Sequence, residues 1–432
     1  MHRRSTPSPF TRVSGTALAN RPSSLAVTVL TLSAFVVPHA ALADCPDVAG
    51  SVRLLSNELP AMQAIAARAS RCATDQLEFT ADQTAEHKDI QVAALTSDPA
   101  AYTTAIVANS SSVPLLNADL LRPLDDLVER YGENLTESQL ITIDGKVMAV
   151  AFMANAQHLF YREDVLKEAG VPVPTTYEEV LAALESIREQ GLMDTPFTST
   201  FAAGWDLGEE FVNLYLGHGG EFFESGSARP SIANEKGVAT LELLKALSGY
   251  MNPDFLTFDT NAAQAEWEEG RAAMMTLWGS RAGATLDDEN STPEVVDNTV
   301  LVAAPTVAGN DIPATTLWWD GIVIAKNVDD ADAEASFRVM MEGIAPALAQ
   351  EEPDAAVWLI DGFEPGPMAA GVSASAAGGA KPYPMLPYMG ILHTAISTEL
   401  VDFMQGKESA EKALEDAETA YLTAARESGF VE

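Results

Sequence analysis

The run Ala105-Ile106-Val107-Ala108 is apolar throughout, as expected of a parallel β-strand whose two faces are both buried. A polar loop is predicted directly after it, at residues 109–112. Upstream, strands are predicted at residues 52–55 and 76–80, a helix begins at Pro60, and a short helical piece covers residues 91–95. This alternation of strands and helices predicts an α/β layer with right-handed crossovers.

The rest of the chain continues this pattern with clear helix boundaries. Thr176 and Glu179 have the spacing of a capping box, and Gly191 ends the helix that they begin. Asn234 is placed to cap a second helix, and a third ends at Gly270. Later strands are predicted at residues 272–277, 299–303 and 317–324. The last hundred residues are expected to be mostly helical, with a break in the stretch rich in Gly, Ala and Pro at residues 362–387.

The N-terminus has the features of a secretory signal peptide. Four arginines and no acids precede the apolar run Leu25–Val37, and Ala41-Leu42-Ala43 follows. We expect cleavage after Ala43 and export to the periplasm, with a twin-arginine signal at Arg3-Arg4 as an alternative to the general route. Lipoprotein processing requires a small residue before the cysteine. Cys45 follows Asp44 instead, so we expect a soluble mature protein.

The chain contains two cysteines, Cys45 and Cys72, and both lie in sequence that is predicted to be exported. Disulfides persist in that compartment, and neither cysteine has another partner. We therefore expect a Cys45–Cys72 bridge. Two buried free thiols are the alternative.

Length and charge limit the classes of function. A chain of 432 residues is too long for one ordinary core and suits two lobes. The net charge of −37 excludes a nucleic-acid-binding protein, because such binding needs a basic face. The acids are scattered along every predicted helix, which favours solvation in a salty habitat over a cationic ligand as their cause.

No motif for catalysis or for a cofactor stands out. The predicted mature chain has four histidines (His87, His158, His218 and His393), none with metal-ligand spacing, and we expect His87 to lie in a loop. A phosphate-binding glycine loop and a nucleophile elbow are both missing from the sequence. We therefore expect neither an enzyme nor a bound metal or cofactor.

The tryptophans do stand out. Trp205 precedes a predicted helix, Trp278 ends a predicted strand, and Trp318-Trp319 lies inside another strand. Aromatic faces commonly stack on the apolar faces of sugar rings, whereas buried tryptophans of the core are the alternative. Trp267 and Trp358, on predicted helices among apolar neighbours, are assigned to packing.

Several segments, in order along the chain, resemble one known family. Phe160–Val171 and Pro174–Glu179 are similar to the "Y-N-K-D-L-F-K-K-A-G … P-x-T-W-x-E" stretch of extracellular solute-binding proteins of the maltose-binding type. Further similarities to the "L-x-P-L-D-D", "DGK-x-x-A-x-P" and "G-x-A-A-M" segments of that family lie at Leu121–Asp126, Asp144–Ala151 and Gly270–Met275.

The resemblance implies a type II periplasmic binding protein fold with two lobes, each a sheet flanked by helices. Hinge crossovers are expected near residues 151–156 and 312–321. The expected order is a signal peptide (1–43), the first part of lobe 1 (44–152), the first part of lobe 2 (153–312), a return to lobe 1 (313–362) and a helical C-terminal part of lobe 2 (363–432). The expected partners are a small-molecule ligand and the permease subunits of an ABC importer, and we expect a monomer.

Candidate ligand-binding residues follow from this architecture, because open α/β sheets bind ligands at the carboxyl ends of their strands. Each candidate lies after a predicted strand, at a crossover, or among the tryptophans just described: Asn57, Glu58, Ser111, Ser112, Asn155, Trp205, Trp278, Arg281, Trp319 and Asp320. For Asn57 and the two serines, turn formation or helix capping is the alternative.

One departure from the family bears on the ligand. Where the family often has a tryptophan that stacks on sugar, this chain reads Trp278-Gly279-Ser280-Arg281. We therefore expect a periplasmic receptor for a sugar or sugar derivative, with an acidic sugar as the sharper hypothesis. A structural ion pair is the alternative role for Arg281. The alternative functions are a receptor for a polyamine, another amine or an organic acid, and a secreted carbohydrate-active enzyme.

Overall fold

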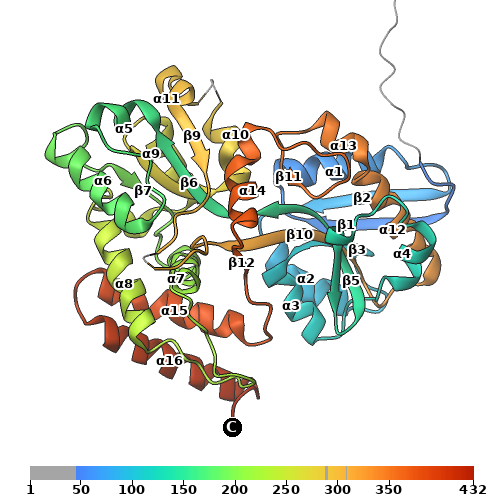
Figure 1. Ribbon diagram of the computed structural model, residues 1–432. Coiled ribbons are helices and arrows are strands. Elements are labelled where there is room, and N and C mark those ends of the chain that lie inside the picture. The colour runs from blue at the N-terminus through green and yellow to red at the C-terminus, as the bar shows by residue number, and fades with distance from the viewer. Residues whose placement is uncertain (1–44, 288–289, 308) are drawn as a thin grey trace, which may run out of the picture. The chain divides into compact units, whose positions relative to one another are not determined.

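The computed structural model describes residues 45–287, 290–307 and 309–432, all within the unit that begins at Ala43. The predicted signal peptide and its cleavage site lie outside these residues. Strands of the described chain form two sheets, and each sheet is flanked by helices (Figure 1). The predicted α/β class with two sheet-centred parts is therefore confirmed.

The first sheet is mixed. Its main path runs β11-β5-β10-β3-β1-β2, with β4 beside β5 and β12 beside β10. β1, β2 and β3 are parallel to one another, as predicted, whereas β10 is antiparallel to both β3 and β5. The strands are β1 (Gly50–Ser56), β2 (Leu77–Gln83), β3 (Thr104–Ala108), β4 (Leu140–Ile143), β5 (Lys146–Asn155), β10 (Thr316–Ile324), β11 (Val357–Trp358) and β12 (Lys381–Pro382).

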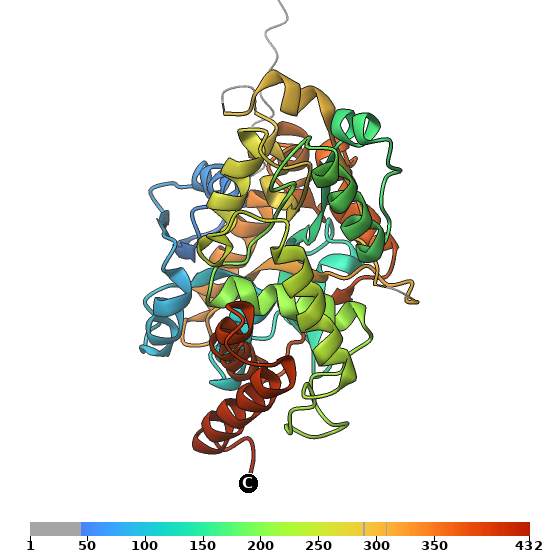
Figure 2. The ribbon, with the colours of Figure 1, turned by 90° about the vertical axis from the view of Figure 1, so that its left-hand side faces the viewer.

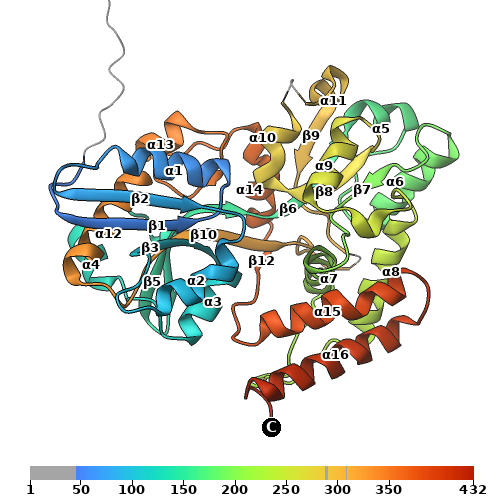
Figure 3. The same ribbon diagram turned by 180° about the vertical axis from the view of Figure 1, so that it is seen from behind.

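Helices cover both faces of this sheet, and the burial of successive residues shows why. Leu54 faces a core shared with α1 and α12, whereas its neighbour Leu55 faces a core shared with α2 and α3. Figure 3 shows α1 on one side of β1 and β2 and α2 with α3 on the other. The helices are α1 (Pro60–Ser70), α2 (His87–Thr96), α3 (Asn109–Asn117), α4 (Asp125–Tyr131), α12 (Asp330–Gly343) and α13 (Pro346–Glu351).

The second sheet has the order β7-β8-β6-β9. Leu159 of β6 faces the largest core, and the next residue, Phe160, faces a smaller core with Trp267. The strands are β6 (Gln157–Arg162), β7 (Phe197–Thr198), β8 (Met274–Trp278) and β9 (Thr299–Val302). The helices that follow these strands are α5 (Glu163–Ala169), α6 (Tyr177–Glu189), α7 (Trp205–Gly217), α8 (Glu235–Ser248), α9 (Thr260–Glu268), α10 (Ala282–Thr285) and α11 (Pro293–Asn298).

The C-terminal region contributes three further helices. α15 (Met389–Met404) and α16 (Ala410–Glu427) pack side by side, and α15 also packs against α7 (Figure 2). α14 (Ala370–Ala377) packs against β6 and β9, so this region adds to the second part of the molecule. Short 3-10 turns lie at η1 (Glu137–Gln139), η2 (Phe255–Thr257), η3 (Gly279–Arg281) and η4 (Pro367–Ala369).

The chain passes between the two sheets at the predicted crossovers. β5 of the first sheet and β6 of the second are separated only by Ala156. β10 begins beside the second core, where Trp318 packs, and ends in the first core with Ile322. The exact division into lobes stays a prediction.

Local features confirm several predictions. Thr176 and Glu179 form the predicted capping box of α6, and Asn234 accepts hydrogen bonds from the backbone N–H groups of Lys236 and Gly237 at the start of α8. Cys45 and Cys72 form the predicted disulfide, which links the start of the described chain to the end of α1. Over the described residues, no helix is long and apolar enough to cross a membrane.

Four local predictions were wrong. Asn109–Ser112 is the first turn of α3 rather than a loop, because its Asn and Ser side chains bond to nearby backbone groups as they do at helix starts. His87 begins α2 and is buried, so it does not lie in a loop. Trp358 is buried as predicted but lies in strand β11, which pairs with β5. The stretch 362–387 contains α14, since its alanines favour a helix between the glycines.

Candidate ligand-binding site

Three tryptophans from three separate elements meet, and we call them the tryptophan cluster: Trp205 at the start of α7, Trp278 at the end of β8 and Trp318 in β10. The Trp205 and Trp278 rings are stacked with centroids 6.3 Å apart, and Trp318 meets them edge-on at 5.7 and 5.8 Å. Trp205 is 42% exposed, whereas Trp318 is 7% exposed. The cluster therefore presents an accessible aromatic ring on a buried aromatic base.

Two further side chains fix the position of Trp205. The His393 ring of α15 stacks on Trp205 at 5.0 Å, and its Nε2 lies 2.9 Å from the Trp205 carbonyl oxygen. The Tyr383 hydroxyl lies 2.9 Å from Nδ1 of the same histidine. Burial lowers the pKa of His393 to about 4, so the imidazole is neutral at neutral pH. A neutral ring held at both nitrogens makes a rigid support for the exposed indole.

Lys88 of α2 reaches the tryptophan cluster from the first part of the molecule. Its ammonium lies 5.8 Å from the centroid of the Trp205 ring, within the range of a cation–π contact. The positive charge of Lys88 also acts on the carboxyl group of Asp320 in β10. Burial raises the pKa of Asp320 to about 7, and Lys88 lowers it in part. The site thus combines an aromatic ring with one basic and one acidic group.

Buried acids lie beneath the cluster on α7. Glu209 Oε1 lies 3.1 Å from Trp318 Nε1 and 2.5 Å from the Thr316 hydroxyl. Glu210 accepts hydrogen bonds from the hydroxyls of Ser199 and Thr200. Burial raises the pKa of Glu209 to about 8 and that of Glu210 to about 7, although these hydrogen bonds lower both in part.

The first crossover joins the second sheet beside this cluster. Asn155 donates to the Ser280 hydroxyl at 3.0 Å and accepts from the Ser280 N–H at 3.1 Å. This pair of bonds ties the crossover to the 3-10 turn that contains Arg281. Arg281 is half-buried, and its guanidinium has no side-chain partner within the part of the chain that the structure describes. The ion-pair alternative for Arg281 therefore finds no partner there.

The positions of the other predicted site residues give weaker support for a role in ligand binding. Ser111 and Ser112 are buried and bond to backbone groups around the start of α3, as the capping alternative describes. Asn57 bonds to the N–H of Glu58, and Glu58 is exposed. Trp319 packs against the core under α2 and α3 rather than in the tryptophan cluster.

Sequence reasoning selected Trp319 where Trp318 joins the cluster. Neighbouring residues of a strand point to opposite faces, so Trp319 shares its face with Val323, which packs in the same core. This alternation along the strand could have distinguished Trp318 from Trp319 in the sequence. Lys88, Tyr383 and His393 had no signal of their own, because only the folded chain brings α2 and α15 to Trp205.

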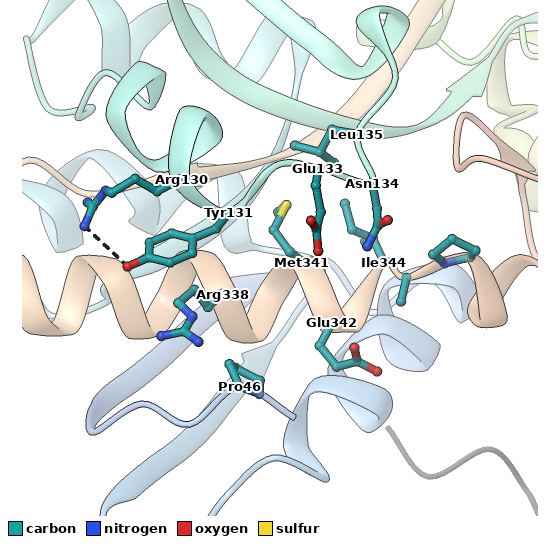
Figure 4. A pocket seen from close by; sticks show the side chains of 12 residues that line it. Pro46, Arg130, Tyr131, Glu133, Asn134, Leu135, Arg338, Met341, Glu342 and Ile344 are labelled. Atoms are coloured by element: carbon teal, nitrogen blue, oxygen red, sulfur yellow. Dashed lines mark hydrogen bonds between the residues drawn. The ribbon is translucent and has the colours of Figure 1, made fainter. Parts of the chain in front are cut away.

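A hollow away from the cluster contains two arginines, Arg130 and Arg338, on either side of Tyr131 (Figure 4). Both guanidinium groups pair with Glu334, at 3.2 Å each. Arg130 also pairs with Asp126 at 3.2 Å, so two carboxylates already compensate the two positive charges. Among the described residues, no group of three or more His, Cys, Asp or Glu side chains is arranged to hold a metal ion.

Comparison with known proteins gives a family match over most of the chain. The family model of bacterial extracellular solute-binding proteins matches residues 57–340. A probable ABC transporter-binding protein of Deinococcus radiodurans is 25% identical over 198 residues, which cover 44% of this chain and 46% of that protein. An uncharacterized ABC transporter extracellular-binding protein of Pyrococcus horikoshii is 29% identical over 94 residues, 22% of each chain. The chain spans less than half the length of these curated relatives.

Solved structures match over nearly their whole length. A solute-binding protein of Agrobacterium radiobacter in complex with ribitol has a TM-score of 0.75 at 18% identity, covering 88% of this chain and 100% of that one. A maltose-bound protein of T. maritima has a TM-score of 0.72 at 16% identity, covering 87% and 99%. At these identities the likeness shows the fold.

Proposed function

The chain belongs to the family of bacterial extracellular solute-binding proteins, and on that premise we propose that it captures a sugar or sugar derivative and delivers it to the permease of an ABC importer. The curated relatives named above are described as ABC transporter-binding proteins, which supports the transport role. Structural neighbours bound to ribitol and maltose support a polyhydroxylated ligand. Capture from outside the membrane agrees with the predicted export of the mature chain to the periplasm.

The tryptophan cluster is the observation that carries this proposal. Trp205 exposes part of a large indole that His393 and Trp278 hold in place. A fixed aromatic face suits the apolar C–H face of a sugar ring. Because the indole is already held in place, binding costs little conformational entropy of the protein. Asn155, Asp320 and Lys88 supply amide, carboxyl and ammonium groups near the cluster for hydroxyl groups. An apolar platform with a few polar groups is the usual composition of a small-molecule site.

Arg281 sharpens the proposal toward an acidic ligand. Arg281 lies three residues after Trp278 in the sequence. No described side chain neutralises the positive charge of its guanidinium group. A planar fork of N–H donors binds a carboxylate better than it binds a neutral hydroxyl. We therefore propose a uronic acid or another anionic sugar as the preferred ligand.

An amine is a second candidate ligand, and Lys88 is the observation that favours it. The ammonium of Lys88 lies over the Trp205 ring and near Asp320, so this position already accepts a cation. A ligand amine that displaced Lys88 would find the same two partners. A binding screen that contains both sugars and amines therefore distinguishes the two candidate ligands.

A thermal-shift screen tests the proposed function. The purified mature protein is heated with neutral sugars, polyols, uronates and amines in turn. A ligand at a hundredfold excess over its Kd stabilises the folded state by about 2.7 kcal/mol, which raises Tm. We expect a rise with a sugar or a uronate. If only amines raise Tm, the second candidate is correct, and if no class does, the proposal fails.

The enzyme alternative is tested with the same compounds. The family and the neighbours are binding proteins, and we propose that this chain releases its ligand unchanged. Prolonged incubation with oligosaccharides, followed by mass spectrometry of the sugars, should show no new product. Hydrolysis that copurifies with the protein at a constant ratio would contradict this.

A further inference from the structure

Glu209 has an unusual place for a carboxyl group. It lies on α7, is fully buried, and contacts both Thr316 and Trp318 of β10. Its Oε2 has no hydrogen-bond partner among the described residues. An ionised carboxylate with one buried oxygen unpaired is strongly disfavoured. The surroundings therefore favour the neutral acid.

The hydrogen count around Thr316 leads to the same conclusion. Its hydroxyl oxygen has three neighbours: Glu209 Oε1 at 2.5 Å, Trp318 Nε1 at 2.7 Å and Asn213 Oδ1 at 2.8 Å. Asn213 Oδ1 also accepts from the Thr316 backbone N–H at 2.7 Å, which fixes the orientation of that amide. Asn213 Oδ1 can only accept, and Trp318 Nε1 can only donate.

One arrangement of protons satisfies all three contacts. The Thr316 hydroxyl donates its single hydrogen to Asn213, and it accepts one hydrogen from Trp318 and one from Glu209. Glu209 must then carry a proton on Oε1. If Glu209 were ionised, the Thr316 hydrogen could satisfy either Glu209 or Asn213, and the other short oxygen–oxygen contact would lack a proton.

We propose that Glu209 is a positioning residue beneath the tryptophan cluster: as a neutral acid it donates to Thr316 and leaves the Thr316 hydrogen for Asn213, and loss of its proton draws that hydrogen to Glu209 and breaks the Thr316–Asn213 bond. Thr316 and Trp318 lie on the same strand, and Trp318 packs edge-on against Trp205 and Trp278, so the broken bond loosens the surface on which the ligand is proposed to stack. This consequence for ligand binding rests on the proposed function, whereas the proton-dependent bond between Thr316 and Asn213 does not.

Other titratable groups surround this position. Glu210 and Asp206 lie on the same helix, and both raise the pKa of Glu209. Tyr383 packs on Trp318, and His393 bonds to Tyr383. Asp320 lies further along β10, and Lys88 faces it from α2. Among the described residues, the side-chain hydrogen-bond partners of Glu209 are Thr316 and Trp318, so its charge develops directly beside the Trp318 indole.

The test needs no ligand. Tryptophan fluorescence and near-ultraviolet circular dichroism of the mature protein are recorded while the pH is raised through 8, the value to which burial raises the pKa of Glu209. We expect a change in both signals that Glu209→Gln abolishes, because glutamine keeps a donor toward Thr316 and does not ionise. Glu210→Gln is the matched control. That neighbouring acid contacts Ser199 and Thr200, so its variant should retain the change.

Two tryptophan variants identify the reporter. Trp318→Phe should abolish the change, and Trp319→Phe should leave it in place, because Trp319 packs in the other core. The proposal is overturned if the wild-type protein shows no change around pH 8, or if Glu209→Gln titrates like the wild type. A negative ligand screen with a positive titration would overturn the proposed function alone.

Discussion

The guanidinium group of Arg281 is the feature on which we base the proposal of an acidic ligand. Arg281 stands on a 3-10 turn that Asn155 ties to the crossover between the sheets. Its half-buried guanidinium has no side-chain partner among the described residues, so we propose that a ligand carboxylate pairs with it. We therefore propose Arg281 as the residue that separates acidic from neutral sugars.

We predict that Arg281→Ala weakens binding of glucuronate by about 1.5–3 kcal/mol, the range of a charge-assisted hydrogen bond. Arg281→Lys should recover little of this loss, because an ammonium lacks the planar fork. Isothermal titration with glucuronate and glucose as a matched pair measures the effect. Equal binding of the two sugars by the wild type, or intact glucuronate affinity in Arg281→Ala, would leave Arg281 without a role in the site.

The roles of single tryptophans could be predicted only in part. Trp267 was correctly assigned to the core, because it lies among apolar residues at helical spacing. The choice between Trp318 and Trp319 depended on which face of β10 meets the second core, and that face is set by strand pairing far along the chain. The sequence around the two tryptophans does not indicate how β10 pairs with distant strands.

At the scale of elements, α7 connects the site to both crossovers. Asn213 on this helix donates to Gln157 at 3.2 Å, just after the first crossover. It also accepts from Thr316 at the start of β10, where the chain returns. One buried amide thus holds both crossovers against the helix whose first residue is Trp205.

We predict that Asn213→Ala lowers the free energy of unfolding by about 1–3 kcal/mol, because buried polar groups on two crossovers lose their partner. Urea unfolding followed by circular dichroism measures it. Asn261→Ala, an exposed residue of α9, is the matched control and should change stability little. A loss in Asn213→Ala no larger than in this control would show that the crossovers do not depend on the amide.

The disulfide is the second prediction at this scale. Cys45 and Cys72, 27 residues apart in sequence, close a loop around β1 and α1. Replacing both with serine should cost about 3–4 kcal/mol of stability in the chain-entropy account. Intact mass should rise by two hydrogen atoms on reduction, and thiol reagents should label only the reduced protein. Labelling of the native protein would contradict the bridge.

Elements with strong local signals were predicted well. The capping box of α6 and the asparagine cap of α8 are side-chain to backbone bonds within one turn, so sequence alone specifies them. The same chemistry misled the prediction at α3, where Asn109–Ser112 resembles a loop because residues of loops and of helix starts are the same. The antiparallel position of β10 required long-range pairing and had no local signal.

For the whole molecule, the fold class followed from alternation and from the order of family-like segments. Two sheets with separate cores and only a few crossing strands are suited to bending at those strands. A ligand that contacts both parts selects the closed state. Lys88 from one part and Trp205 from the other already meet at the cluster.

We predict that ligand compacts the mature protein. Small-angle scattering should show a smaller radius of gyration when a sugar identified by the thermal-shift screen is present at saturation. A compound of the screen that fails to raise Tm serves as the negative control. An unchanged radius with a bound ligand would mean that capture does not require bending at the crossovers.

The central claim is that the tryptophan cluster binds a sugar, and isothermal titration of the wild type and Trp205→Ala tests it most directly. With the best sugar or uronate of the screen, the wild type should bind and Trp205→Ala should bind at least about tenfold more weakly, a loss of about 1.4 kcal/mol. Phe430→Ala, which removes an exposed ring near the C-terminus, should bind like the wild type. Unchanged affinity in folded Trp205→Ala would contradict the account.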